Sequence, residues 1–266
     1  SRHDLTDDQW AVIEPLIPKK PRARGRPRND DRRTLNGMLY VLHTGCAWAD
    51  LPTEYGSPST CWRRWHAWSQ DGTWERIWRT LLSRLDADSK LEWARAFLDG
   101  SFVPAKKGAL AEANEVGKGS KVMVVVDGTG VPIGLHVASA HPHERTLAEA
   151  TLRTIRVPRR RGRPSTRPNE VVADNADDRA ALRSDVRRRG ITPTMPSRER
   201  RNRQRPKRGR PLRTGASYQH RWTVERCFAW MDTYRRLVVR YDRHLHSSRA
   251  FCLVAIMLWC VDRILK

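Results

Sequence analysis

The sequence contains no apolar segment long enough to span a membrane. Its longest apolar run, residues 250–261, has 12 residues, whereas a transmembrane helix needs about 20. We therefore expect a buried C-terminal helix there and no membrane partner. The first residues show no signal peptide, which predicts a cytoplasmic protein.

Paired cysteines are also missing. The five cysteines at positions 46, 61, 227, 252 and 260 show neither the spacing of a zinc site nor a disulfide framework. Widely spaced, odd-numbered thiols are typical of a protein that folds in a reducing compartment. We expect these thiols to be reduced and mostly buried.

Acidic residues are few relative to basic ones. The chain has 29 Asp and Glu against 51 Lys and Arg, which gives a formal net charge of +22. A charge of this size exceeds what solubility requires and indicates a polyanionic partner. Because the sequence offers no segment for a membrane, we expect that partner to be nucleic acid.

Much of the positive charge lies in two loops, at residues 153–168 and 198–213. The tetrapeptide RGRP occurs at residues 24–27, 161–164 and 208–211, and its arginines can lie along a narrow A·T-rich minor groove. The alternative is a plain arginine-rich loop in which glycine and proline break regular structure. In either case we expect these loops to be disordered until phosphates neutralise them. The candidate DNA contacts are Arg26, Arg161, Arg163, Arg208 and Arg210.

Residues 1–90 show helical patterns throughout and predict a small helical domain. A capping-box pattern at residues 6–9 starts the first helix, a second runs from residue 30 or 31 to 45, and two more begin near residues 57 and 74. In the third helix, Arg63 and Arg64 alternate with tryptophans, which favours DNA contacts by a helix-turn-helix-like domain. The alternative is a bundle with a solvated basic face, because the connection before the third helix is longer than a standard helix-turn-helix turn.

After residue 90 the pattern changes to alternating strands and helices. This order predicts an α/β fold with a mixed sheet flanked by helices. A hairpin at residues 128–130 joins two of the strands. The predicted strands are residues 97–104, 122–127, 131–139, 171–174 and 191–194, and the predicted helices are residues 143–155, 178–189 and 218–243.

Three acids lie on these elements in positions suited to a metal site. Asp99 and Asp174 end predicted strands, and Glu225 lies on the last predicted helix. A hard divalent cation needs several oxygen ligands, so the three are candidate catalytic and metal-binding residues. Taken singly, each has a structural explanation: a strand-end turn, a helix cap, and an ion pair with Arg221. Asp127 is not included among these candidates, because the Asp-Gly turn of a hairpin explains an aspartate at this position.

The last predicted helix carries a charged stripe and an apolar face. At about 100° per residue, the stripe groups Tyr218, Arg221, Glu225, Asp232 and Arg236. The helix therefore presents one carboxylate among cations. The apolar face, which we expect to pack on a core, consists of Val224, Cys227, Phe228, Met231, Tyr234 and Val238.

In this order, the motifs resemble those of a known family. Residues 97–101 (FLDGS), 171–178 (VVADNADD) and the spacing Tyr218-x2-Arg221-x3-Glu225 are similar to the three acidic motifs of DDE transposases from bacterial insertion sequences, and most similar to the insertion-sequence four/five supergroup. The N-terminal segment LTDDQWAVIEPLIP and the segment GCAWADLP also resemble that family. The resemblance covers nearly the whole chain.

The resemblance implies an RNase H-like catalytic domain at residues 91–266, with a five-stranded mixed sheet, after a DNA-binding domain at residues 1–90. It implies that Asp99, Asp174 and Glu225 hold two Mg²⁺ ions, for which Mn²⁺ can substitute. Tyr218 and Arg221 are then expected to hold phosphates near the scissile bond, and Arg236 is a further candidate DNA contact on the same helix.

The implied reaction is hydrolysis at the ends of a mobile element, followed by attack of the freed 3′ hydroxyls on target DNA. The implied partner is double-stranded DNA, as terminal inverted repeats and as target, in the bacterial nucleoid. Because joining two ends to one target needs two active sites, we expect a homodimer that assembles on DNA.

The sequence departs from the family pattern at two positions. Asp232 stands where the family has a lysine seven residues after the glutamate, and Arg235 or Arg236 is expected to supply the cation instead. Asp177 stands where a tyrosine often follows the second aspartate. These departures leave open a decayed or repurposed sequence-specific DNA-binding protein. A nonspecific coating protein is disfavoured, because coating DNA or RNA needs no ordered set of three acids.

Overall fold

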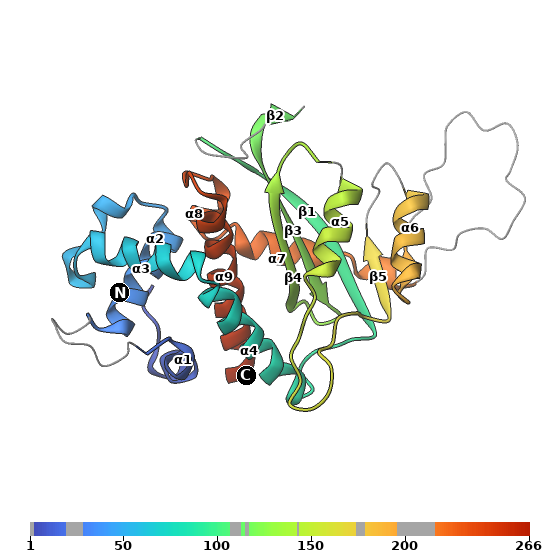
Figure 1. Cartoon of the computed structure of the whole chain (residues 1–266), viewed down its shortest axis with the longest axis horizontal. Helices are drawn as coiled ribbons and strands as arrows, with labels where there is room; N and C mark the ends of the chain where they lie inside the picture. The colour runs from blue at the N-terminus through green and yellow to red at the C-terminus, as the bar shows by residue number, and fades with distance from the viewer. Residues whose placement is uncertain are drawn as a thin grey trace, which may run out of the picture.

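The computed structural model describes residues 3–19, 29–106, 113–114, 117–142, 144–173, 179–195 and 216–266. In the described part, a group of helices lies to one side of a mixed sheet (Figure 1). The chain begins and ends in the helical part, and the sheet lies between these segments in the sequence.

The four N-terminal helices form as the sequence predicts. They are α1 (Asp7–Ile13), α2 (Asp31–Thr44), α3 (Pro58–Gln70) and α4 (Thr73–Ala87). Thr6 Oγ1 accepts from Gln9 N, while Thr6 N donates to Gln9 Oε1, so the capping box that starts α1 is confirmed. Gly45 ends α2 with a φ of +71°, a conformation that glycine adopts without strain.

The C-terminal helix α9 (Leu245–Leu265) completes the core of this helical group. It packs against α1, α3 and α4, and the Trp65 ring of α3 stacks on Phe251 with ring centroids 3.9 Å apart. The indole Nε1 of Trp65 also donates to Ser247 Oγ at 2.9 Å. The buried C-terminal helix is thus confirmed. In the part of the chain that the structure describes, no helix is both long enough and apolar enough to cross a membrane.

The sheet has five main strands in the order β4-β3-β1-β5-β6. The strands are β1 (Arg95–Pro104), β3 (Gly117–Asp127), β4 (Pro132–Ser139), β5 (Glu170–Ala173) and β6 (Thr192–Thr194). Antiparallel pairing joins β1 to β3 and β3 to β4, and parallel pairing joins β1 to β5 and β5 to β6. A short β2 (Ala113–Asn114) pairs with the start of β3. This is the RNase H-like mixed sheet that the resemblance implies.

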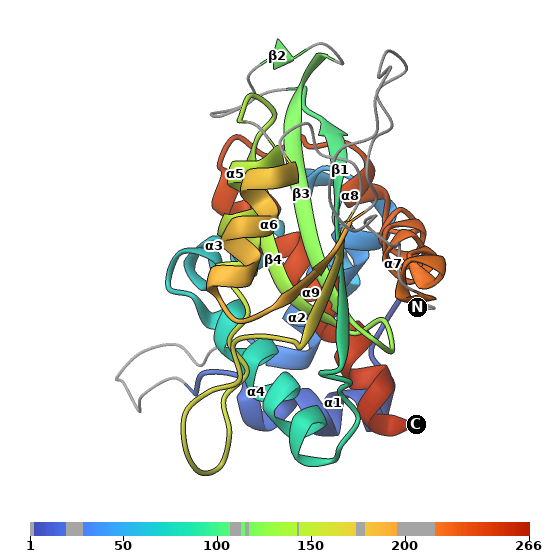
Figure 2. The same cartoon turned by 90° about the vertical axis from the view of Figure 1, so that its right-hand side faces the viewer.

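Helices lie on both sides of the sheet. The helices α5 (Glu144–Arg153) and α6 (Arg179–Arg188) contact each other, and α5 packs on β1, β3 and β4. Figure 2 shows both on one side of β1 and β3, with α7 (Trp222–Met231) on the other. Buried valines, leucines and phenylalanines of β1, β3 and β5 fill the space between the layers. The flanked mixed sheet is therefore confirmed.

The prediction of one long helix at residues 218–243 is wrong. A 3₁₀ turn (Ala216–His220) precedes α7, and a short helix α8 (Arg235–Val238) follows it after a break. Thr233 Oγ1 donates to Trp230 O at 2.7 Å, a local bond that competes with continued helix. Tyr234 is extended and buried, and its ring centroid lies 4.7 Å from that of His43. Tertiary packing of Tyr234 therefore overrides the helical period.

The break changes the predicted apolar face at its far end. Val224, Cys227, Met231 and Tyr234 are buried as expected, but Val238 is 43% exposed. Val238 follows the break, so it no longer shares a face with the residues of α7.

The basic loop at residues 153–168 has a defined conformation, whereas its charge predicted disorder. Val157 is fully buried and pairs with Ser165 through two backbone hydrogen bonds of 2.9 Å. Arg159 also makes an ion pair of 3.4 Å with Asp86 of α4. Two buried apolar residues, Ile155 and Val157, and these bonds fix the loop despite its charge. The second basic loop, at residues 198–213, lies outside the described residues.

Candidate catalytic site

Asp99 lies on the central strand β1, at the point where burial of the strand ends. Phe97 and Leu98 are buried, Asp99 is half-buried and Gly100 is exposed. The Asp99 Oδ1 accepts a hydrogen bond of 2.8 Å from Gly100 N. A Cβ at position 100 would lie only 2.4 Å from the sulfur of Met123 on β3, so a larger residue after the aspartate would require the Met123 side chain to shift. Pairing on both sides of β1 holds the carboxylate on a rigid support.

The strand β5 runs beside β1 and leads to the second candidate acid. Leu98 pairs with Ala173, the last residue of β5. Asp99 follows Leu98 in the sequence, just as Asp174 follows Ala173. Asp174 and Asp177 lie outside the described residues.

Glu225 projects from α7, which packs against β1 and β3. The buried side chains of Val224 and Cys227 fix α7 on the sheet. The Glu225 side chain remains 53% exposed, and its Oε1 accepts a hydrogen bond of 2.7 Å from Nη2 of Arg221, one turn earlier. The structure thus brings the helix of Glu225 against the strand of Asp99.

Another acid, Asp127 at the end of β3, has a structural role. It is 1% exposed and accepts hydrogen bonds from the backbone N–H groups of Glu92, Thr129 and Val131. Burial raises the pKa of the Asp127 carboxyl, against the lowering effect of these donors. Asp127 therefore fixes the hairpin between β3 and β4, as its Asp-Gly sequence predicts.

Arg236, a predicted DNA contact, is buried by the break after α7. It is 8% exposed, its Nη1 donates to Cys46 O at 3.2 Å, and its Nη2 makes an ion pair of 3.1 Å with Asp242. Its guanidinium also lies 5.3 Å from the ring centroid of Phe251. This environment corrects the prediction that Arg236 faces DNA, because α8 points it into the interior. Arg235, the other cation considered, is exposed.

The remaining predicted DNA contacts differ in their surroundings. Arg63 is exposed on α3. Arg64 pairs with Asp31 at 2.6 Å and so links α3 to the start of α2. Arg161 and Arg163 are exposed on the first basic loop. Four predicted contacts cannot be placed in this way. The side chain of Tyr218 lies outside the described part, and so do the whole residues Arg26, Arg208 and Arg210.

A cavity at the start of α7 was not foreseen from the sequence. It has a volume of about 360 Å³ and lies between the start of α7 and the β3–β4 turn, with Arg95, His220 and Trp222 in its lining. Trp222 is 49% exposed, and the Arg226 guanidinium lies 4.9 Å from its ring centroid. An aromatic followed four residues later by arginine could have indicated this pair, but not the cavity that it lines.

The cysteines are free, as expected, and four of the five are buried. Burial raises the pKa of the Cys227 and Cys252 thiols to about 12. These thiols therefore stay protonated at neutral pH, which leaves the carboxylates as the chemical groups of interest.

Asp99 and Glu225 offer oxygen ligands of the kind that hard divalent cations prefer. Both side chains are accessible to solvent. The described residues contain no group of three His, Cys, Asp or Glu placed to hold a metal ion. The two carboxylates fit a metal site that needs at least one further ligand.

Comparison with known proteins agrees with this geometry. Residues 95–260 match the family described as "Transposase DDE domain", and residues 5–78 match the one described as "Putative transposase of IS4/5 family". The chain therefore belongs to the DDE transposases, in the group of the IS4/5 family.

Two relatives come from one insertion element of Burkholderia cepacia. An uncharacterised 16.2 kDa protein of element IS402 is 41% identical over 107 residues, which is 38% of this chain and 73% of that protein. The "Putative transposase for insertion sequence element IS402" is 32% identical over 143 residues, which is 53% of this chain and 63% of that protein.

Proposed function

We propose that this transposase binds the terminal inverted repeats of its element, hydrolyses the DNA at their ends and joins the 3′ hydroxyls to target DNA. The observation that carries the proposal is the packing of α7, with Glu225, against β1, with Asp99. The name of the IS402 relative supports the same reaction.

In this proposal Asp99, Asp174 and Glu225 hold the metal ions, Mg²⁺ or Mn²⁺. Bound metal would activate the attacking hydroxyl and stabilise the leaving oxygen of the phosphodiester. Asp99 supplies its carboxylate from a fixed strand, and Glu225 supplies one from a fixed helix. Arg221 holds the Glu225 side chain in place through their hydrogen bond of 2.7 Å, and it would bind a phosphate near the scissile bond together with Tyr218.

The division of labour along the chain is also proposed. Residues 1–90 would bind DNA, with Arg63 on the exposed face of α3 beside Trp62, which is also exposed. Residues 91–266 would carry out the chemistry. A homodimer formed on DNA would bring two such sites to one target.

The second candidate function is a DNA-binding protein that no longer cuts. Asp232 favours it, because this carboxylate is exposed at the C-terminal end of α7, two turns after Glu225, where the family has a lysine. An acid at a helix C-terminus is also unfavourable to the helix dipole. Arg235, which is exposed after the break, is the remaining candidate for the missing cation.

The test is cleavage of labelled duplexes taken from the DNA that flanks the gene, with Mg²⁺ or Mn²⁺. We expect cuts at a fixed position by the wild type, and a loss of at least about 100-fold in Asp99→Asn and Glu225→Gln with binding retained. Asp88→Asn, at an exposed acid in the loop after α4, is the matched control and should cut normally. Wild-type cleavage by Glu225→Gln would refute its role, and binding without cleavage by the wild type would favour the second candidate.

A further inference from the structure

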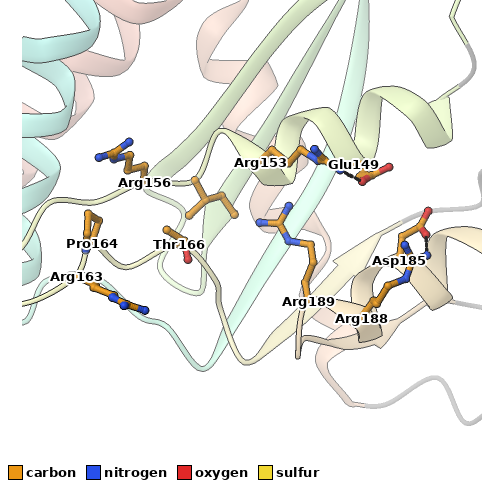
Figure 3. A pocket seen from close by; sticks show the side chains of 10 residues that line it. Glu149, Arg153, Arg156, Arg163, Pro164, Thr166, Asp185, Arg188 and Arg189 are labelled. Carbon is orange, nitrogen blue, oxygen red and sulfur yellow. Dashed lines mark hydrogen bonds and ion pairs between the residues drawn. The ribbon is translucent and has the colours of Figure 1, made fainter.

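A cavity of about 710 Å³ opens on the side of the sheet that carries α5 and α6. Figure 3 shows its lining. Arg156 and Arg163 come from the first basic loop on one side, and Arg153, Arg188 and Arg189 come from the ends of α5 and α6 on the other. The first basic loop and the ends of α5 and α6 therefore border one cavity.

The lining has a large excess of positive charge. It holds five guanidinium groups but only two carboxylates, those of Glu149 and Asp185. Glu149 pairs with Arg153, and Asp185 pairs with Arg188. Within the part of the chain that the structure describes, the loop arginines 156 and 163 make no ion pair. The residues that line the cavity thus carry a net charge of +3, which favours an anion there.

Arg189 is the most enclosed of these cations. It is half-buried, and its Nη2 donates to Leu152 O at 3.0 Å, near the end of α5. Burial and the nearby charge of Arg153 lower the pKa of Arg189. Holding like charges close together is unfavourable unless an anion compensates them, and partial burial of Arg189 adds to this cost. A bound anion would therefore gain from charges that the fold has already assembled.

The loop that contributes Arg156 is fixed before any ligand arrives. Arg79 of α4 donates to Arg156 O and to Thr154 O, and Val157 and Ser165 pair across the loop. The loop therefore needs no ordering on binding, which reduces the entropic cost of forming a complex.

We propose that this cavity is a second DNA-binding site, in which the arginines bind backbone phosphates. Guanidinium groups form paired hydrogen bonds with phosphate oxygens, and the cavity is large enough for a phosphate together with its sugar. The site is separate from Glu225, because α7 lies on the other side of the sheet (Figure 2). This inference rests on the proposed DNA substrate but not on the cutting reaction.

The test is the salt dependence of DNA binding by the full chain. The double variant Arg156→Ala/Arg163→Ala removes the two cavity arginines that make no ion pair in the described residues. The control, Arg187→Ala/Lys266→Ala, removes two exposed cations, one of α6 and one after α9, that lie outside the lining and outside residues 1–90, for the same change in charge. Fluorescence anisotropy would follow two 30-bp duplexes, one from the DNA flanking the gene and one of arbitrary sequence.

The slope of log K against log salt concentration is negative, and each lost phosphate contact makes it less steep by about 0.9. We therefore expect the magnitude of the slope to fall by about 1.8 in the cavity variant and to change little in the control. A fall with both duplexes indicates general backbone binding, as for target DNA, and a fall with the flanking duplex alone assigns the site to the element's ends. A wild-type slope in the cavity variant with both duplexes overturns the proposal. Wild-type protein that binds with the expected slopes but cuts neither duplex would refute the proposed reaction and leave this site standing.

Discussion

Replacing Asp127 by Asn tests whether this acid stabilises the fold, in contrast to the candidate catalytic acids. The carboxylate Oδ1 accepts from Thr129 N at 3.0 Å and Val131 N at 2.8 Å, while Oδ2 accepts from Glu92 N at 2.8 Å. The Asn oxygen can replace Oδ1, but its amide NH₂ would then face the N–H of Glu92. The variant therefore loses one hydrogen bond to a charged group and leaves a donor unpaired.

A hydrogen bond to a charged group contributes about 1.5–3 kcal/mol. Removing the buried charge offsets part of this loss, since burial disfavours the ionised carboxyl. We expect Asp127→Asn to lower the free energy of unfolding by about 2 kcal/mol, a Tm decrease of about 5 °C. Asp127→Ala, which loses the acceptor for three backbone donors, should cost about 4 kcal/mol.

Urea denaturation at pH 7 followed by tryptophan fluorescence measures these differences. Asp88→Asn, at an exposed position, is the control and should change stability by less than about 0.5 kcal/mol. If Asp127→Asn is as stable as the wild type, the hydrogen-bond accounting is wrong. If it keeps wild-type stability but loses DNA cleavage, Asp127 belongs to the catalytic site instead.

Two further predictions concern the helical part. Glu75 makes ion pairs with Arg79 and Arg249; burial alone would raise its pKa, but these arginines outweigh burial and hold it below the ordinary value of 4.5. The stability that Glu75 contributes is thus present above pH 4.5 and lost as the pH falls through its folded pKa. Glu75→Gln should lower the free energy of unfolding by about 2 kcal/mol at pH 7. In urea denaturation, the variant should also lose less stability than the wild type between pH 7 and pH 3.5. An equal loss in the two proteins would contradict the role of these ion pairs. Gly45→Ala should cost about 1–2 kcal/mol in the same assay, because φ is +71° and the new Cβ would lie 3.1 Å from Arg235 Cβ; an unchanged midpoint would show that the turn relaxes.

Local patterns in the sequence predicted most of the elements correctly. The capping box at Thr6, the glycine at position 45 and the Asp-Gly turn after β3 determine the backbone within a few residues of themselves. The alternating apolar runs likewise predicted β1, β3 and β4, because their period depends only on the strand itself. Such features need no knowledge of the rest of the chain.

The errors arose where distant contacts decide the conformation. The helical period continues from residue 218 to 243, yet the chain breaks after α7 because Tyr234 packs beside His43 of α2. The same break turns Arg236 toward Asp242 instead of solvent. Likewise, charge alone predicted disorder at residues 153–168, but burial of Val157 holds that loop in place.

The sequence by itself therefore determined the charge of the protein, the order of its strands and helices along the chain, and the candidate acids, because these follow from residue types and local periods. Tertiary structure alone decided which of these groups meet. It packed the helix of Glu225 against the strand of Asp99, and it assembled Arg188 and Arg189 with the arginines of the loop at residues 153–168 into one cavity. Side chains far apart in the sequence come together only when the core packs, and no local pattern records that packing.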